Sequence, residues 1–229
     1  MAGSSRNKAA LLLGVAFFLV LFSALGVWQV ERRAWKLDLI ERVESRVHAA
    51  PVTTFESDQE YLHVRVTGSF DPERSVLVQA NTVLGPGHWV IAPLRFSDGS
   101  FALINRGFVP LDAKAAPAPA GAQTITGLLR LSEPGGSLLR HNEPAAGRWF
   151  SRDVQAIAAS LSLHQAVPYF IDQDKHGADE AWPVGGLTVI RFPNNHLQYA
   201  ITWFGLALLC AVAGVVVWRH DNRAHAEKT

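Results

Sequence analysis

The sequence predicts an α+β membrane protein in which two transmembrane helices, one N-terminal and one C-terminal, flank a small periplasmic domain. We expect this domain to be mainly antiparallel β-sheet with one or two helices. Three observations predict this class: residues 9–30 carry no charge, residues 199–218 carry none either, and the segment between them alternates apolar and polar residues over short stretches. About 20 uncharged, mostly apolar residues can cross a bilayer as a helix, whereas alternation is typical of strands.

The first apolar run is predicted to be an uncleaved transmembrane helix over residues 9–30. A secretory signal peptide is the alternative, because the small residues Ala24 and Gly26 resemble a cleavage site. The apolar core of a signal peptide has only about 7–15 residues, however, and this run is longer and leads into a helical pattern. No Arg- and Ser-rich transit peptide precedes it, so we expect a bacterial plasma (inner) membrane.

The second apolar run predicts a transmembrane helix, and the charges beside it predict the orientation. Three cations between Arg219 and Lys228 follow the run, and only Arg191 precedes it closely, which favours a cytoplasmic C-terminus. Charges around the first run point weakly the other way, so the second run decides the orientation of this multi-pass protein. The predicted parts are a cytoplasmic N-terminus 1–8, helix 9–30, periplasmic domain 31–195, helix 196–218 and cytoplasmic tail 219–229.

The helical pattern continues beyond the first run, with apolar residues at three- and four-residue spacing up to Val47, and Pro51 marks its stop. One predicted helical face just outside the bilayer carries two indoles, an amide and two cations. Such a face is typical of an interface belt with snorkelling cations. The alternative is a docking surface for an amphipathic anion such as a porphyrin with carboxylate tails. The residues of this face are Trp28, Gln29, Arg32, Trp35 and Lys36.

The middle of the chain predicts short strands and one helix, the pattern of a small antiparallel sheet or barrel. The helix is expected over about residues 152–161 after a Ser151 cap, and residues 113–122, rich in Ala and Pro, are expected to form an exposed loop. Turns are predicted at 85–87 and at 97–99, where the second closes a hairpin. The predicted strands are 61–67, 75–79, 89–96, 101–106, 124–131, 168–172 and 187–192.

Composition and motifs exclude several classes of function. A formal net charge of +1 gives no electrostatic reason to expect nucleic-acid binding. The single Cys210 rules out an intrachain disulfide and a paired-cysteine metal or redox site. No nucleophile elbow, phosphate-binding loop, dinucleotide fingerprint or zinc-protease motif is present, so we expect no enzyme. Isolated histidines such as His63 and His88 are interpreted as surface or core residues.

His196 lies just ahead of the second apolar run, with Tyr199 and Trp203 at i+3 and i+7. The aromatics are ordinary interface anchors, but an ionisable residue at membrane depth is costly and often functional. Two interpretations stay open: the imidazole bonds backbone groups or water, or it is a cofactor ligand, since neutral imidazole is a common axial ligand of haem iron. For a ligand, we expect Asn194, Asn195 or a backbone carbonyl to hold the second ring nitrogen.

Arg106 follows a predicted strand and is expected to have a structural role. Its guanidinium should bond backbone carbonyls or a carboxylate such as Asp153.

The sequence also resembles the Surfeit locus protein one family over nearly its whole length. The N-terminal motif is Leu25-Gly26-Val27-Trp28-Gln29 followed by Arg32, Trp35 and Lys36, and the C-terminal motif covers residues 194–204. Shorter matches lie between them at 87–94, 105–110 and 148–153. One departure is Phe108, where the family usually has Trp; an aromatic ring is kept.

The resemblance implies an assembly factor, or chaperone, for haem-copper cytochrome c oxidase in respiratory chain complex IV biogenesis. Bacterial members resemble haem a binding proteins that assist haem insertion into subunit I, with His196 as a haem contact and axial ligand to its iron. Expected partners are oxidase subunit I, haem a synthase and membrane lipids, without nucleic acid. A haem-free scaffold that stabilises subunit I and a periplasmic hydrolase are the alternatives. The cofactor-binding residues expected on this basis are His196, Tyr199, Trp203, Trp28, Gln29, Arg32 and Trp35.

Overall fold

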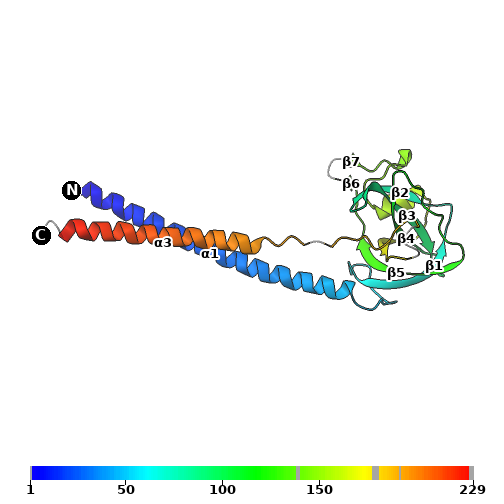
Figure 1. Ribbon diagram of the computed structural model, residues 1–229, viewed down its shortest axis with the longest axis horizontal. Helices are drawn as coiled ribbons and strands as arrows, with labels where there is room; N and C mark the ends of the chain where they lie inside the picture. The colour runs from blue at the N-terminus through cyan, green and yellow to red at the C-terminus, as the bar shows by residue number, and fades with distance from the viewer. Residues whose placement is uncertain (1, 138–139, 177–180, 191, 227–229) are drawn as a thin grey trace. The chain divides into compact units, whose positions relative to one another are not determined.

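The computed structural model describes residues 2–137, 140–176, 181–190 and 192–226, and the chain divides into two compact units (Figure 1). One unit contains Met1–Arg42 and Arg191–Thr229, and the other contains Val43–Ile190. The predicted class is confirmed in its coarse features, because apolar terminal helices flank a β-rich domain that also contains helices.

The helical unit consists of most of α1 (Ala2–Val47) and all of α3 (His196–Ala226). The segments Lys8–Val47 and His196–Arg219 are each long and apolar enough to cross a membrane. Helix α1 continues well past its apolar run, as the spacing of the apolar residues predicts, and ends before Pro51, which cannot continue a helix. Most apolar side chains of both helices are exposed, which is the expected pattern for lipid-facing surfaces.

The two helices contact each other in antiparallel order. The ring of Phe22 stacks on Trp203 with centroids 5.7 Å apart. At Gly26 a Cβ would lie 2.6 Å from the Phe204 ring, so a glycine is needed for this close approach. Because α1 and α3 run in opposite directions, the start of α3 lies beside the part of α1 that follows Gly26.

The β-domain is built on a six-stranded sheet in the order β1-β5-β8-β4-β3-β2, with β6 and β7 as a separate hairpin. Neighbouring strands are antiparallel except for β4 and β8, which run parallel. The strands are β1 (His63–Phe70), β2 (Val76–Thr82), β3 (Gly85–Arg95), β4 (Phe101–Pro110), β5 (Ala122–Leu131), β6 (Gly136–Ser137), β7 (Arg140–His141) and β8 (Ala166–Gln173).

A further pairing curls this sheet into a barrel. Strand β1 pairs with β3 at Ser69–Arg95 and Phe70–Leu94, which closes the circuit β1-β5-β8-β4-β3. A Greek-key barrel of five strands with this connectivity is the arrangement of the OB-fold. Strand β2 then pairs with the rest of the same β3 edge. The predicted small sheet or barrel is therefore present, with one parallel pair that the sequence analysis did not expect.

Each face of the sheet has its own apolar core. Val64, Leu94, Ile104 and Ile171 belong to the core inside the barrel, where their side chains are fully buried. The outer face packs against α2 (Val154–Ser160) through a second cluster that includes Ile157. Successive residues of a strand point to opposite faces, so adjacent positions such as Leu103 and Ile104 serve different cores. This explains why β4 is buried along almost its whole length.

Several local predictions were wrong. The sequence Gly85-Pro86-Gly87 lies in β3, not in a turn. Gly87 is needed there for close packing against β4, since a Cβ would lie 2.2 Å from the carbonyl oxygen of Val109. Residues 187–190 form no strand; residue 191 lies outside the described residues. The cap of α2 is Asp153, whose Oδ1 accepts from the Ala156 N–H at 3.1 Å, and not Ser151.

The structure also contains short helical elements. Besides α2, which falls inside the predicted range 152–161, the described residues include the 3-10 helix η1 (Pro144–Ala146). The turn at 97–99 does close the β3–β4 hairpin, with the Phe96 N–H bonded to the Ser100 carbonyl at 2.9 Å.

Candidate functional site

His196 is the first residue of α3, and a hydrogen bond ties its ring to α1. Its Nδ1 lies 2.8 Å from Oε1 of Gln29, a side chain that is only 8% exposed. An amide oxygen can only accept, so Nδ1 carries the hydrogen and donates it. In the neutral ring Nε2 then keeps a lone pair. The contact therefore selects the imidazole tautomer that can bind a metal through Nε2.

The residue that holds this ring was predicted incorrectly. We expected Asn194, Asn195 or a backbone carbonyl near His196 in sequence, whereas the acceptor is Gln29 from the other helix. The antiparallel helices bring together two side chains 167 positions apart, which sequence proximity does not indicate. Asn194 is nevertheless unusual, because its Oδ1 is buried without a hydrogen-bond partner in the part of the chain that the structure describes.

On α3, the side chains nearest α1 do not include all the predicted site residues. Ala200 and Ala207 are buried, and Trp203 stacks on Phe22 at an interplanar angle of 24°. These positions follow His196 at i+4, i+7 and i+11, which is one helical face. Tyr199 lies beside that face and is 54% exposed. The structure thus brings Trp203 to the helix pair and leaves the Tyr199 ring on its outer side.

The predicted face of α1 divides in a similar way. Gln29 turns toward α3, whereas Trp28 is 52% exposed and Trp35 is also exposed. The Arg32 guanidinium stacks over the Trp35 ring, 4.1 Å from its centroid, and Lys36 Nζ lies 5.3 Å from the Phe192 ring centroid. Two cations thus lie on aromatic rings within two helical turns of the histidine-bonded Gln29.

This arrangement suits a metal that brings most of its own ligands. Among the described residues, no group of three or more His, Cys, Asp or Glu side chains could hold a bare ion. One imidazole with a free Nε2 is enough for a porphyrin iron, whose ring nitrogens supply the equatorial ligands. Exposed aromatic and apolar side chains around it match an apolar macrocycle, and Arg32 and Lys36 match anionic tails.

The β-domain contains a polar cluster that the sequence analysis missed, which we call the Asp172 network: Asp172, Arg130, Arg152, Glu133, Asn105 and Thr188. The Asp172 carboxylate is 4% exposed and accepts from Arg130 Nη1 at 3.0 Å and Arg152 Nη1 at 3.1 Å. It also accepts from Asn105 Nδ2 at 2.7 Å and Thr188 Oγ1 at 2.9 Å. All its lone pairs are used, so the cluster is a structural one.

Electrostatics within the Asp172 network are mutually favourable. Burial disfavours the charged forms of Glu133 and Arg152. The hydrogen bond and the attraction between these two side chains outweigh that cost, and Asp172 adds a further attraction to Arg152. The pKa of Glu133 is therefore lowered and the pKa of Arg152 is raised. The members come from β4, β5, β8 and the segments around them, and no sequence spacing could have identified them.

Arg106 has the predicted structural role, with a different partner from the named carboxylate. Its Nη1 donates to the carbonyl of Ala116 at 2.9 Å and its Nη2 to the carbonyl of Pro117 at 3.1 Å. Asp153 instead caps α2 and accepts from the Gly135 N–H. The expected strand end at Arg106 is also corrected, because β4 continues to Pro110.

Comparison with known proteins identifies the family of this chain. The SURF1 family model matches residues 16–208, a range that includes Gln29 and His196. Surfeit locus protein 1 of Mus musculus is 34% identical over 220 residues, with 83% of this chain and 71% of that protein covered. The Homo sapiens protein of the same name is 33% identical over 210 residues, covering 80% of this chain and 69% of its own length. This chain therefore belongs to the SURF1 family.

Proposed function

We propose that this protein binds haem a and assists its insertion into subunit I of cytochrome c oxidase. SURF1 family proteins are cytochrome oxidase assembly factors, not catalysts, and oxidase subunits are their partners. The observation that carries the haem proposal is the 2.8 Å hydrogen bond from His196 Nδ1 to Gln29. It supports the proposal, because a neutral ring that donates from Nδ1 to this amide oxygen keeps the Nε2 lone pair for an iron.

Each residue of the helix pair has a stated role in this proposal. His196 would bind the iron of haem a through Nε2, and Gln29 would orient the ring. Trp203, Tyr199, Trp28 and Trp35 offer aromatic surface to the macrocycle and its apolar tail. Arg32 and Lys36 would neutralise the propionates, as cations do for carboxylates near a membrane surface. When bound, haem a supplies a redox-active iron, and the chain's part is to hold that group out of water until transfer.

The same proposal includes a location. Both terminal helices are consistent with membrane insertion, and we propose a bacterial inner membrane with the two termini cytoplasmic and the β-domain periplasmic. The apolar ring and tail of haem a suit the lipid phase. A carrier with the ligand at the end of a membrane helix would receive it from haem a synthase without exposing it to water.

An absorption spectrum tests the proposal. The full chain is produced together with the enzymes of haem a synthesis, purified in detergent and compared with the same preparation made without those enzymes. We expect a haem a band at a fixed haem-to-protein ratio in the first preparation. Colourless protein that still associates with subunit I would refute haem binding and favour the haem-free scaffold.

A further inference from the structure

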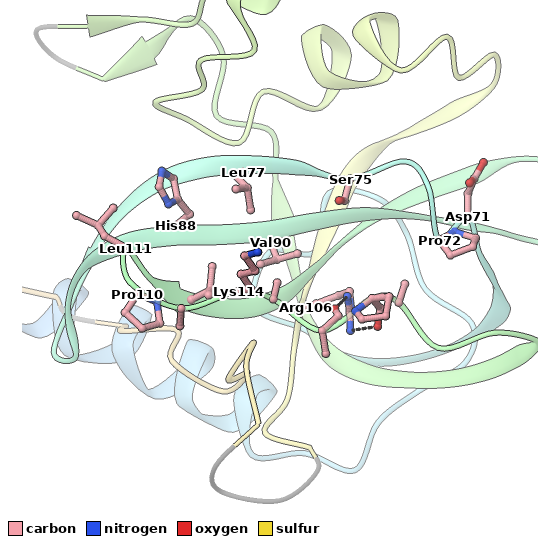
Figure 2. A pocket seen from close by; sticks show the side chains of 16 residues that line it. Asp71, Pro72, Ser75, Leu77, His88, Val90, Arg106, Pro110, Leu111 and Lys114 are labelled. Carbon is pink, nitrogen blue, oxygen red and sulfur yellow. Dashed lines mark hydrogen bonds between the residues drawn. The ribbon is translucent and has the colours of Figure 1, made fainter.

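A cavity of about 440 Å³ lies in the β-domain, on the face of β2, β3 and β4 that continues the barrel interior (Figure 2). Such a volume falls within the range of about 300–1,000 Å³ typical of small-molecule sites. In Figure 2, Val90 and Lys114 lie between His88 and Arg106, and Leu77 on β2 and Ser75 just before β2 lie above them in the view. Residues 113–118 form the opposite wall.

The cavity exists because β3 changes partner along one edge. At Leu94 and Arg95 that edge pairs with β1, and from Gly85 to Ile91 it pairs with β2. The barrel therefore opens between β1 and β2 and exposes inward-facing positions of β2, β3 and β4. The Ala- and Pro-rich loop is mostly exposed, as predicted, and residues 113–118 of it also cover this opening. Arg106 holds the loop there by donating to the carbonyls of Ala116 and Pro117.

Arg106 is the feature that indicates a ligand. Its side chain lines the cavity, yet the residue is only 5% exposed. Two N–H groups are used by the loop carbonyls, and a guanidinium has further donors. None of the described carboxylates forms an ion pair with it. Burial lowers the pKa of Arg106, with no neighbouring anion to oppose the effect. Buried cations are normally paired.

Lys114 is a second cation in the lining of the cavity. Lys114 extends from the loop and His88 from β3, and neither has a described hydrogen bond or ion pair. The acidic residue in the lining is Asp71, whose carboxylate already pairs with Arg74 Nε at 3.1 Å. Between the cations, Leu77 and Val90 provide apolar surface. This lining suits one anionic group attached to a small apolar body.

We propose that this cavity binds a small organic carboxylate, with the carboxylate on Arg106 and Lys114 and its apolar part on Leu77 and Val90. An anion there would neutralise the charge of the buried Arg106 guanidinium. It would also accept hydrogen bonds from both walls of the cavity, from Arg106 on β4 and from Lys114 on the loop. This site is separate in sequence and chemistry from His196, and it does not depend on haem binding.

The test uses 4-fluorobenzoate as the probe and the full chain in lipid nanodiscs. Fluorine NMR of the probe should show line broadening that grows with protein concentration, while the neutral isostere 4-fluorobenzamide shows little. Lys114→Gln should weaken binding on the order of tenfold, because it removes a charge-assisted hydrogen bond from an exposed loop position. Arg65→Gln removes another exposed cation, which lies on β1 outside the cavity, and should leave binding unchanged.

The outcomes separate a built site from general attraction. Arg106→Ala should abolish binding, and because it can also release the loop, Lys114→Gln remains the deciding variant. Equal broadening by the benzoate and the benzamide would overturn the proposal. So would equal losses in Lys114→Gln and Arg65→Gln, or no broadening of the benzoate by the wild-type protein at millimolar concentration. None of these results bears on haem binding at His196.

Discussion

The Asp172 network and the Gln29–His196 pair are both buried or half-buried polar groups, but they differ in how completely they are bonded. Asp172 accepts from two arginines, an asparagine and a threonine. His196 has one described bond, on Nδ1. A saturated polar network rigidifies a domain, whereas a buried polar group with bonding capacity left over needs another explanation. We infer that the network maintains the β-domain and that the pair is available for a ligand.

The largest expected effect comes from breaking the Asp172 network. Asp172→Ala would leave two partly buried arginines without their common anion, and removal of one partner of a buried ion pair costs about 3–5 kcal/mol. Urea unfolding of the purified protein should show this loss. Haem bound per folded molecule should stay constant. A variant with normal stability would mean that the network contributes little.

Changes in the Gln29–His196 pair should weaken haem binding and leave the stability of the β-domain unchanged. Gln29→Leu keeps a helix-forming side chain of similar size but removes the acceptor for the His196 Nδ1–H. Loss of such an orienting partner typically weakens metal binding about 10–100-fold. Haem retention during dilution measures this, while unfolding of the β-domain should not change. Gln29→Glu keeps an acceptor and serves as the matched control. If Leu and Glu variants retain haem equally, the hydrogen bond has no role in binding.

A smaller effect should distinguish the two neighbouring arginines of α1. Arg32 lies over Trp35 on the predicted face, whereas Arg33 is off it. Arg32→Ala should therefore weaken haem retention by several-fold, the range of one surface ion pair of up to about 1 kcal/mol, and Arg33→Ala should matter less. The readout is haem remaining after gel filtration. Equal losses would indicate general attraction to anionic lipid.

The smallest effect concerns pH and the β-domain. His63 Nδ1 bonds the Ala49 carbonyl at 2.8 Å and Nε2 bonds Asp174 Oδ2 at 2.7 Å. Burial lowers its pKa, but these bonds and the Asp174 charge outweigh that, so the pKa is raised above 6.5. A group with a raised pKa contributes stability to the folded state. This contribution is fully present below the pKa of the unfolded state and is lost as pH rises through the pKa of the folded state. The contribution of His63 to the free energy of unfolding should therefore be larger at pH 5.5 than at pH 8.5 in the wild type. His63→Gln should lack this difference.

The parts of the fold that depend on local pattern were predictable. The terminal helices follow from charge-free runs and the β3–β4 hairpin from Ser97-Asp98-Gly99. The bonding of Arg106 to carbonyls was predicted from a strand end that the structure does not contain, since β4 continues to Pro110. Features that depend on pairing across the chain were not predictable. Gly85–Gly87 resembles a turn until the contact with β4 is known. The partner of His196 became visible only when the antiparallel helices brought Gln29 beside it.

Chemical rescue of His196→Gly tests the central claim most directly. Glycine at the first position of α3 leaves the rest of the helix intact and removes only the imidazole. The variant, produced with the enzymes of haem a synthesis, should lack the wild-type haem band, and free imidazole added together with haem a should restore it at constant protein. A His196→Gly protein with the wild-type haem spectrum and stoichiometry before any imidazole is added would contradict the assignment of His196 as the iron ligand.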